Sequence, residues 1–448
     1  MKSIPMKKVK SLLPLGCSVL AACLHSNVSA NGYQFLHQSA EGLGSAYSAN
    51  GTAINDISSM FSNPASIIRS DGTRFSGSFT LDLPRSEMDQ ASATSPYSDG
   101  TVDVTGTPEE PTQFIDTAYG AASYFTHQLN PDLVLGLAIN APYAYESNYP
   151  TTAVSRYTAT KTELRALNLS PTFAYRVNEK LAIGGALNFQ YYQAVLGTQV
   201  ATIVSDPTVS TDLDSEMKGN DLGYGYSLGF EYQATDNTRL GVSYRSKIEH
   251  EFDGDIEFSG TDANLATLGS LVPTLTGFSG GASFDVATPS MLQIGLLHKF
   301  DEKFELYANG NYSGWRAFKD THIIYDNGLP DTIVDNNWND SWFVAVGFGY
   351  QLNDKVKLRT GVAYDWTPTP ASVVSPRAPN NDRYYAAVGA SYELSPQTKI
   401  DFGYQYIKFN EVTIALEGGN NIPRGTLDSK VNLYANVFIT QLNHKFNF

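Results

Sequence analysis

Cysteine is nearly absent from this sequence. The 448 residues include only Cys17 and Cys23, and both lie within the first thirty positions. If those thirty residues are removed, the remaining chain can form neither a disulfide nor a cysteine-based metal site. Long apolar runs are lacking as well, because nothing after residue 30 approaches the roughly 18 consecutive apolar residues that a membrane-spanning helix requires. These absences exclude a disulfide-stabilised scaffold and a bundle of membrane helices.

A basic surface and the common catalytic motifs are also lacking. The formal net charge is −15, so the chain has no electrostatic footprint for nucleic acid. It contains no phosphate-binding loop or dinucleotide fingerprint, and none of its histidines belongs to a recognisable nucleophile motif. Asp253, Asp255 and Glu257 alternate along the chain but lack the rest of a calcium-loop pattern. We therefore expect no catalytic residue, no metal site, no cofactor and no nucleic-acid partner.

The first thirty residues are typical of a secretory signal peptide. Lysines between positions 2 and 10 precede an apolar stretch from Leu12 to Leu24, and Val28-Ser29-Ala30 forms a small-residue cleavage site. We predict residues 1–30 to be the signal peptide and the mature chain to begin near Asn31. One alternative stays open, because Leu20-Ala21-Ala22-Cys23 resembles a lipoprotein processing site at which Cys23 would be acylated.

What the sequence does contain is a regular alternation of apolar and polar residues. Between Lys355 and Trp366 the even positions are mostly apolar and the odd ones charged or small, and the ranges Asp221–Tyr232 and Thr398–Tyr406 repeat this pattern. Period-two alternation is the signature of a β-strand with one apolar face. These strands run for about 10 to 15 residues, which suits a tilted strand that crosses a membrane better than a strand of a soluble protein.

Six short turns divide the chain into hairpins. They lie at 130–132, 178–180, 236–238, 301–303, 353–355 and 395–397, and longer irregular stretches separate the hairpins. Short periplasmic turns and long extracellular loops are typical of bacterial outer-membrane barrels. Six hairpins, an earlier strand near 72–85 and a final strand at 430–448 make about fourteen strands. We therefore predict an all-β fold, a transmembrane antiparallel β-barrel over residues 72–448, located in the bacterial outer membrane.

Residues 31–71 do not alternate. The stretch from Ala53 to Phe61 is typical of a short helix that ends before Asn63-Pro64. A barrel of this size encloses a water channel unless something fills it, so we expect 31–71 to form a hatch, or plug, inside the lumen. A periplasmic tail is the alternative. At the other end, Phe448 closes an amphipathic segment and resembles the assembly signal of outer-membrane barrels, which implies the barrel assembly machinery as a partner.

Several short segments, in a specific order, resemble one family. Asn31-Gly32-Tyr33-Gln34, Gly42-Leu43-Gly44-Ser45-Ala46-Tyr47-Ser48 and Asn63-Pro64-Ala65 are similar to the mature N-terminus of the FadL family of outer-membrane transporters. The resemblance continues along the barrel through 174–178, 288–290, 359–365 and 382–384 and covers essentially the whole mature chain. It implies a fourteen-strand barrel with an N-terminal hatch, which carries long-chain fatty acids or similar hydrophobic molecules passively across the outer membrane.

The resemblance also implies roles for particular residues. Tyr33 matches an aromatic residue that sits in the tight lumenal site, and Asn63, Pro64 and Ala65 match the hatch motif. In that family the substrate leaves sideways through a gap at a kinked third strand. Here the third strand, expected near 132–147, contains Pro142, which cannot donate to the ladder and therefore marks a bulge or a missing pairing. A position above the lipid, near the end of the strand, is the alternative for Pro142.

Two further sets of residues are candidates for contact with substrate. The family carries a basic residue for the carboxylate on its fifth strand, where this chain aligns Gln193, so a neutral hydrocarbon becomes a second candidate cargo. In the stretch 258–287, five apolar residues at helical spacing form a stripe that suits an extracellular binding groove. They are Leu265, Leu268, Leu271, Val272 and Leu275. Folding of this stripe onto the barrel rim is the alternative.

Other function classes stay in competition with the transporter. An outer-membrane lipid hydrolase would need a nucleophile, a base and an orienting group on the wall, and a general porin or surface receptor would share the barrel without a lumen-filling hatch. An aromatic hydrocarbon channel would share the whole fold. We expect a monomer that contacts outer-membrane lipid and lipopolysaccharide and binds a long-chain fatty acid or another small hydrophobic molecule.

Overall fold

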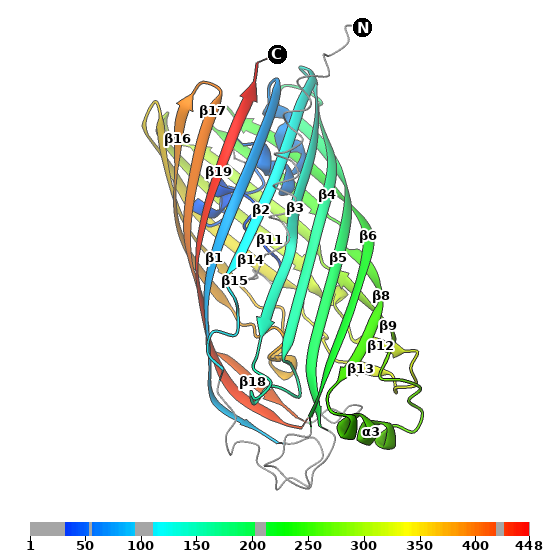
Figure 1. Cartoon of the computed structure of the whole chain (residues 1–448). Coiled ribbons are helices and arrows are strands. Elements are labelled where there is room, and N and C mark those ends of the chain that lie inside the picture. The colour runs from blue at the N-terminus through cyan, green and yellow to red at the C-terminus, as the bar shows by residue number, and fades with distance from the viewer. Residues whose placement is uncertain (1–31, 53–55, 95–110, 202–211, 418–424, 448) are drawn as a thin grey trace.

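In the computed structural model, a closed antiparallel β-barrel surrounds a short N-terminal segment (Figure 1). The structure describes residues 32–52, 56–94, 111–201, 212–417 and 425–447. The expected signal peptide at 1–30, the alternative lipidation site Cys23 and the terminal Phe448 lie outside the described residues. None of the described helices combines the length and the apolar composition needed to cross a membrane.

The described wall consists of nineteen strand segments. They are β1 (Thr73–Ala93), β2 (Ala118–Asn130), β3 (Leu133–Asn148), β4 (Lys161–Arg176), β5 (Leu181–Ala201), β6 (Asp212–Thr235), β7 (Thr238–Arg245), β8 (Ile248–Ser259), β9 (Ser279–Thr288), β10 (Ser290–Lys299), β11 (Phe304–Gly314), β12 (Thr321–Tyr325), β13 (Thr332–Val334), β14 (Ser341–Asn353), β15 (Val356–Asp365), β16 (Arg383–Ser395), β17 (Thr398–Phe409), β18 (Val412–Leu416) and β19 (Leu427–Phe446).

Five of these segments continue a neighbour after a short interruption. Segments β7 and β8 form one barrel strand, because both pair with β6 on one side. Segments β9 and β10 form the next strand, since β9 pairs with β8 and β10 pairs with β7. Segments β17 and β18 form another, because both pair with β19. In the same way β12 extends β11 and β13 leads into β14. The nineteen segments therefore make fourteen barrel strands, and the predicted strand number is confirmed.

The barrel closes where its first and last strands meet. Thr73 of β1 is paired with His127 of β2 on one side and with Phe446 of β19 on the other. All six predicted turns connect neighbouring antiparallel strands, as between Asn130 and Leu133. The start of β1 and the end of β19 lie at the same end as these turns, and the longer loops and helix α3 lie at the opposite end (Figure 1). We call these the short-turn end and the long-loop end.

The two faces of the wall differ in polarity. On β6 the residues Leu222, Tyr224, Tyr226, Leu228, Phe230 and Tyr232 are exposed on the outer face. The residues between them are glycine, serine and glutamate, and Ser227 and Glu231 are buried on the inner face. An apolar outer band with a polar interior is what a barrel in a bilayer requires, since lipid contacts the outside and the inside holds polar groups.

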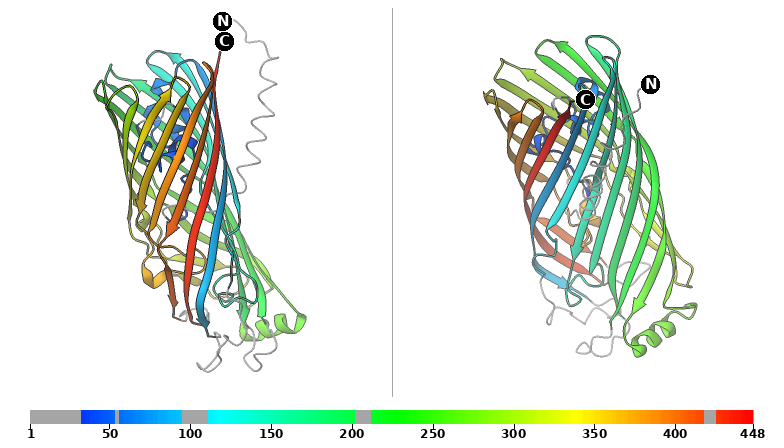
Figure 2. Two further views of the ribbon diagram at one scale, coloured as in Figure 1. Left: turned by 90° about the vertical axis from the view of Figure 1, so that its left-hand side faces the viewer. Right: turned by 45° about the horizontal axis from the view of Figure 1, so that its top comes forward.

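The N-terminal segment lies inside the barrel, where Figure 2 shows it between the walls. This inner segment, residues 32–52 and 56–70, is buried along almost its whole length. It contains α2 (Ala40–Gly44) and the 3-10 helices η2 (Ile57–Phe61) and η3 (Pro64–Arg69). Helix α3 (Asp262–Leu271) lies at the long-loop end (Figure 1), η5 (Trp315–Ala317) lies between β11 and β12, and η6 (Ala371–Val373) lies in the loop between β15 and β16.

Each short helix of the inner segment begins at a polar capping residue. The side chains of Ser39, Asp56 and Asn63 accept hydrogen bonds from the main-chain N–H groups two or three residues further on. Such caps satisfy the first N–H groups of a helix and contribute about 1 kcal/mol each. The helix expected between Ala53 and Phe61 is thus observed over its second half, and its first residues lie outside the described part of the chain.

Glycines in the wall let the inner segment approach closely. A Cβ atom at Gly229 of β6 would collide with the side chain of Asn63, and one at Gly241 of β7 would collide with the carbonyl of Gly51. On the opposite wall, a Cβ at Gly361 of β15 would meet the carbonyl of Ser45. The small residues on the inner face therefore fit the barrel to this segment on two sides.

Candidate functional site

An apolar cavity of about 840 Å³ lies in the lumen between Tyr33 and the long loops. The wall contributes apolar residues from β4, β5, β6, β8 and β9: Leu164, Leu196, Met217, Phe252, Phe284 and Val286. The loops contribute Phe318, Trp338, Val373 and Ala378. A largely apolar cavity of this size suits a small-molecule ligand, and burial of apolar ligand surface there contributes about 25 cal/mol per Å².

Tyr33 forms the floor of the cavity within an aromatic cluster. Its ring centre lies 5.0 Å from that of Trp315, 5.7 Å from those of Phe318 and Trp338, and 6.0 Å from that of Tyr143. Burial and then the neighbouring hydroxyl of Tyr192 raise the pKa of Tyr33, so the phenol stays neutral. The residue therefore presents an uncharged aromatic surface to the cavity.

A single cation lies among the described residues that line this cavity. It is Arg377, in the loop between β15 and β16, and the lining carboxylates are Asp320, Asp335 and Glu417. The Nη1 atom of Arg377 donates to the main-chain oxygens of Lys161 (3.3 Å) and Gly197 (3.4 Å). These bonds hold the guanidinium at the lining of the cavity.

The wall is interrupted beside the cavity floor, in β3. Pairing between β2 and β3 ends at Ser123 and Ile139, and the register between β3 and β4 shifts between Asn140 and Tyr143. Pro142 lies within this shift, and its missing N–H explains why the ladder is not continued there. Residues 140–145 are all buried, so the inside–outside alternation is lost as well. The interruption falls in the middle of β3.

The beginning of the inner segment occupies the edge that β2 leaves open. We call Tyr33–Phe35 the strap; it ends two residues before His37, which pairs with the buried Asp82 of β1 (3.5 Å). The N–H of Phe35 donates to the oxygen of Pro142 (2.8 Å), and the N–H of Ala144 donates to the oxygen of Tyr33 (3.2 Å). Between these bonds, Gln34 is paired with Tyr143 in an antiparallel bridge. The strap thus supplies the strand pairing that β3 lacks, and the same Tyr33 lines the cavity.

The inner segment is held against the inner face of β5, β6 and β7 by three residues, Asn63, Pro64 and Ala65. The Asn63 side chain donates to the oxygens of Gly51 (2.9 Å) and Phe230 (3.0 Å) and accepts from the N–H of Ala65 (3.0 Å). Pro64 follows at the first position of η3, where its fixed φ is compatible with a helix. These three residues do not line the cavity, so their contacts suit a fixed support.

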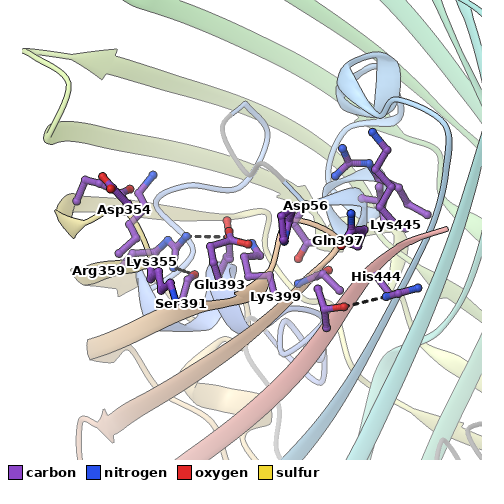
Figure 3. Close-up of a pocket in the computed structure, with 18 of the residues that line it drawn as sticks. Asp56, Asp354, Lys355, Arg359, Ser391, Glu393, Gln397, Lys399, His444 and Lys445 are labelled. Carbon is purple, nitrogen blue, oxygen red and sulfur yellow. Dashed lines mark hydrogen bonds and ion pairs between the residues drawn. The ribbon is translucent and has the colours of Figure 1, made fainter. Parts of the chain in front are cut away.

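A buried charge cluster, whose members Arg359 and Lys399 are labelled in Figure 3, holds α2 to the opposite wall. We call Glu41, Arg359, Lys399 and Asp401 the anchor cluster. Glu41 of the inner segment pairs with Arg359 of β15 (2.7 Å) and with Lys399 of β17, and Lys399 also pairs with Asp401 (3.3 Å). Burial opposes ionisation of Glu41, but Arg359 and Lys399 outweigh it and hold the pKa of Glu41 below its usual range.

The anchor cluster borders a second cavity, of about 440 Å³, at the short-turn end. Its lining is mainly charged and includes Lys355, Lys357, Glu305 and Glu393. Asp56 of the inner segment also lies here, and burial raises the pKa of this carboxyl to about 6. A chamber lined in this way disfavours an apolar molecule, because charged groups would lose hydration without gaining a partner.

Two of the sequence-predicted sets do not reach the apolar cavity. Tyr192 and Ala194 line it, whereas Gln193 alternates with them and is half-buried on the other side of β5. In α3 and the following loop, Leu268 is buried, Leu265, Val272 and Leu275 pack against the barrel core, and Leu271 is half-exposed. These contacts favour the alternative in which the leucine stripe folds onto the barrel rim.

Sequence reasoning missed three groups: the cation Arg377, the aromatic partners Trp315 and Trp338, and the anchor cluster. A charged pattern on inward positions of β15 and β17 was a usable signal for the anchor cluster, since Arg359 and Lys399 stand in strands of a barrel interior. Nothing in the local sequence marks Arg377. Within the described ranges, no three histidine, cysteine, aspartate or glutamate side chains are grouped so as to hold a metal ion.

Comparison with known proteins gives consistent matches over most of the chain. Residues 21–446 match the family described as outer membrane protein transport protein (OMPP1/FadL/TodX). The long-chain fatty acid transport protein of Escherichia coli strain K12 is 26% identical over 426 residues, covering 89% of this chain and 92% of that protein. The crystal structure of a Pseudomonas aeruginosa FadL homologue superposes with a TM-score of 0.82 at 22% identity, covering 93% of this chain and 100% of that one. That of the Ralstonia pickettii toluene transporter TbuX gives 0.64 at 17% identity, covering 93% and 99%.

Proposed function

Because the chain belongs to the OMPP1/FadL/TodX family of outer-membrane transport proteins for hydrophobic compounds, we propose that it carries long-chain fatty acids passively across the bacterial outer membrane. One observation carries this proposal. Tyr33 lines the apolar cavity and also belongs to the strap that fills the interruption in β3. A single movement of the strap would therefore open the cavity floor and an outlet through the wall together.

The lining of the cavity supports an amphiphile with an acidic head. The apolar walls favour a hydrocarbon chain, and Arg377 offers a charge-assisted contact to a carboxylate, of about 1.5–3 kcal/mol. The E. coli relative is by name a long-chain fatty acid transport protein. Gln193 plays no part in this proposal, since its neighbours Tyr192 and Ala194 are the residues of β5 that line the cavity.

The outlet is lateral in this proposal. The short-turn end, which we place in the periplasm, is lined by the anchor cluster and other charged residues, so it offers an apolar cargo no favourable surface. The interruption at Pro142 opens toward the bilayer between β2 and β3 once the strap is displaced. The main-chain groups that β2 leaves unpaired at this edge are tolerable in a membrane because the strap forms hydrogen bonds with them.

The remaining roles follow from the same geometry. We propose that the protein performs no chemistry on its cargo; no histidine lines the cavity among the described residues, so a nucleophile there would lack a histidine base. We propose a monomer, because each edge strand of the described wall is paired within one chain. Outer-membrane lipid, lipopolysaccharide and the barrel assembly machinery are its proposed partners, and residues 1–30 its proposed signal peptide.

Uptake by intact cells tests the function directly. Cells that lack their own outer-membrane fatty-acid transporter would be given radiolabelled oleate, with and without this protein, and toluene in parallel. We expect oleate uptake to be restored, and Arg377→Gln to lower it about tenfold with little effect on toluene. Equal surface levels of the folded barrel would be checked by its heat-modifiable migration on gels.

Two outcomes would change the assignment. Restored uptake of toluene alone would support the second candidate, an aromatic hydrocarbon channel, which the cluster of Tyr33, Trp315, Phe318 and Trp338 also favours. No uptake of either compound, with folded protein at the surface, would contradict the transporter and leave a porin or receptor to be tested by conductance. A collapse of uptake on loss of the proton gradient, at constant substrate consumption, would contradict the passive mechanism.

A further inference from the structure

A row of polar side chains crosses the inner wall at one level, directly below the apolar cavity. Asn140 of β3 is paired with Asn168 of β4, which is paired with Gln190 of β5. Next to them, the ring of His250 from β8 lies over Gly223, the β6 partner of Gln190. We call Asn140, Asn168, Gln190 and His250 the polar arc.

Hydrogen bonds connect most of the polar arc. The Nε2 atom of Gln190 donates to the Oδ1 of Asn168 (2.8 Å), and the Oε1 of Gln190 lies 2.9 Å from the Nε2 of His250. The Nδ1 of His250 lies 3.0 Å from a carboxylate oxygen of Asp221, which fixes the ring. Three members of the arc, Asn168, Gln190 and His250, are therefore hydrogen-bonded in a row, and Asn140 stands next to this row without joining it.

The two ends of the polar arc lie at the two places that the proposed route must connect. At one end the ring of His250 lies 5.2 Å from that of Tyr192 and 6.0 Å from that of Phe252, and both of these line the apolar cavity. At the other end, Asn140 is the last residue of β3 in regular register before the interruption. The arc thus runs from the cavity floor to the outlet.

Asn140 differs from the rest of the arc because its amide is unused. It is 1% exposed, and neither its nitrogen nor its oxygen has a hydrogen-bond partner in the described part of the chain. A buried amide without partners costs about 1–3 kcal/mol, so a partner that arrives during transport would be bound favourably. An amide suits either a carboxylate, through its N–H groups, or a hydroxyl, through both groups.

We propose that the polar arc is a head-group path, along which the hydrogen-bonding head of an amphiphilic cargo passes from the cavity to the outlet while its chain stays in apolar surroundings. This rests on the proposed function and makes it more specific. The cargo class is then a long hydrocarbon chain with one acidic or hydroxyl head, because a plain hydrocarbon gains nothing from the arc. Asn140 is the last contact before the head enters the bilayer.

Three cargoes of equal chain length test this path in the uptake assay: oleate, oleyl alcohol and 1-octadecene. In Asn140→Leu we expect uptake of the acid and the alcohol to fall about tenfold, with the alkene unchanged. Asn309→Leu is the matched control, since Asn309 is a buried inward asparagine of β11, away from the arc.

The outcomes separate the path from the transporter itself. Equal loss for all three cargoes in Asn140→Leu would overturn the path, because it would show a steric or folding defect that ignores the head group. No loss for any cargo would overturn it too, and would leave Asn140 as a hydrated wall residue. Failure of the proposed function would appear differently, as absent uptake of all three cargoes with the unsubstituted protein.

Discussion

The inner segment is held to the barrel in two different ways on its two sides. Around α2, buried charges tie Glu41 to Arg359 and Lys399, and wall glycines bring main chains into contact. Along β3, the strap is held by a few main-chain hydrogen bonds and by the ring of Tyr33. The charged contacts around α2 stabilise the plug only while the partners keep this geometry. The strap, in contrast, resembles a strand added at a sheet edge, and its displacement would leave no buried charge without a partner.

From this difference we expect the strap to move and the region around α2 to stay in place. Displacing α2 would leave buried ions without partners, which costs several kcal/mol. Displacing the strap costs a handful of hydrogen bonds of about 1 kcal/mol each, and a bound cargo could replace the aromatic contacts of Tyr33. We therefore propose that the anchor cluster keeps the plug in the barrel during transport and that the strap is the part that moves.

Fixing the strap in place should have the largest effect. Gln34 and Tyr143 are an antiparallel pair without mutual hydrogen bonds, whose Cα atoms are typically about 4.5 Å apart, so cysteines at both positions can form a disulfide. We expect oleate uptake by the oxidised double variant to fall more than about tenfold and to return on reduction. The single variants Gln34→Cys and Tyr143→Cys are the controls. Unchanged uptake with the disulfide formed would contradict a moving strap.

Weakening the anchor cluster should have the next largest effect. Glu41→Gln leaves Arg359 and Lys399 with one fewer buried carboxylate and should destabilise the seated plug by about 3 kcal/mol. The expected readout is steady ion conductance in planar bilayers and faster proteolysis of the inner segment. Asp71→Asn is the control, because Asp71 forms exposed ion pairs with Arg74 and Lys445 at the same end, worth under about 1 kcal/mol. Equal conductance and equal proteolysis of the two variants would contradict a special role of the buried anchor cluster.

Local sequence signals were sufficient to predict the barrel, but they did not indicate that the plug is held by buried charges on one side and by strand pairing on the other. Alternation and turn residues act over a few positions, so the fourteen strands, the six turns and the place of Pro142 could be predicted. The pairing of Glu41 with Arg359 joins positions 318 apart in the sequence. The contact exists only once the barrel has closed around α2, so no local pattern could indicate it.

Side-chain direction was the other limit. Gln193 and Tyr192 are adjacent on β5, and a shift of one position in a strand moves a residue to the other face of the sheet. The neighbours Tyr192 and Ala194 on β5 therefore line the cavity, whereas Gln193 between them does not. The leucine stripe has a related limit, since a helical pattern shows which residues share a face but not whether that face meets ligand or wall, and here most of it packs on the barrel core.

A pH titration should distinguish two carboxylates on the supported side. Burial raises the pKa of Asp56 from 3.8 to about 6, so the folded state binds the proton more tightly, and this stabilisation is present below about pH 4 and lost as pH rises through 6. The pH dependence due to Glu41 has the opposite sign. Because its pKa is lowered in the folded state, Glu41 stabilises the fold at pH values above the ordinary pKa of a glutamate, and this stabilisation is lost as the pH falls through its lowered pKa. From the Asp56 shift alone, the free energy of unfolding in detergent should rise by about 1.3 kcal/mol between pH 7 and 5. Asp56→Asn should abolish it, and an unchanged gain in that variant would contradict the assignment.

Restoring the ladder in β3 should have the smallest effect, because the strap already satisfies most of the edge. Pro142→Val returns one N–H and should lower oleate uptake about threefold by favouring continued pairing. Pro171→Val on β4 is a matched control, since Pro171 also stands within a strand but is exposed on the outer face and stays paired with Leu137. If the two variants reduce uptake equally, proline itself is responsible; if only Pro142→Val does so, the interruption in β3 is part of the route that the strap closes.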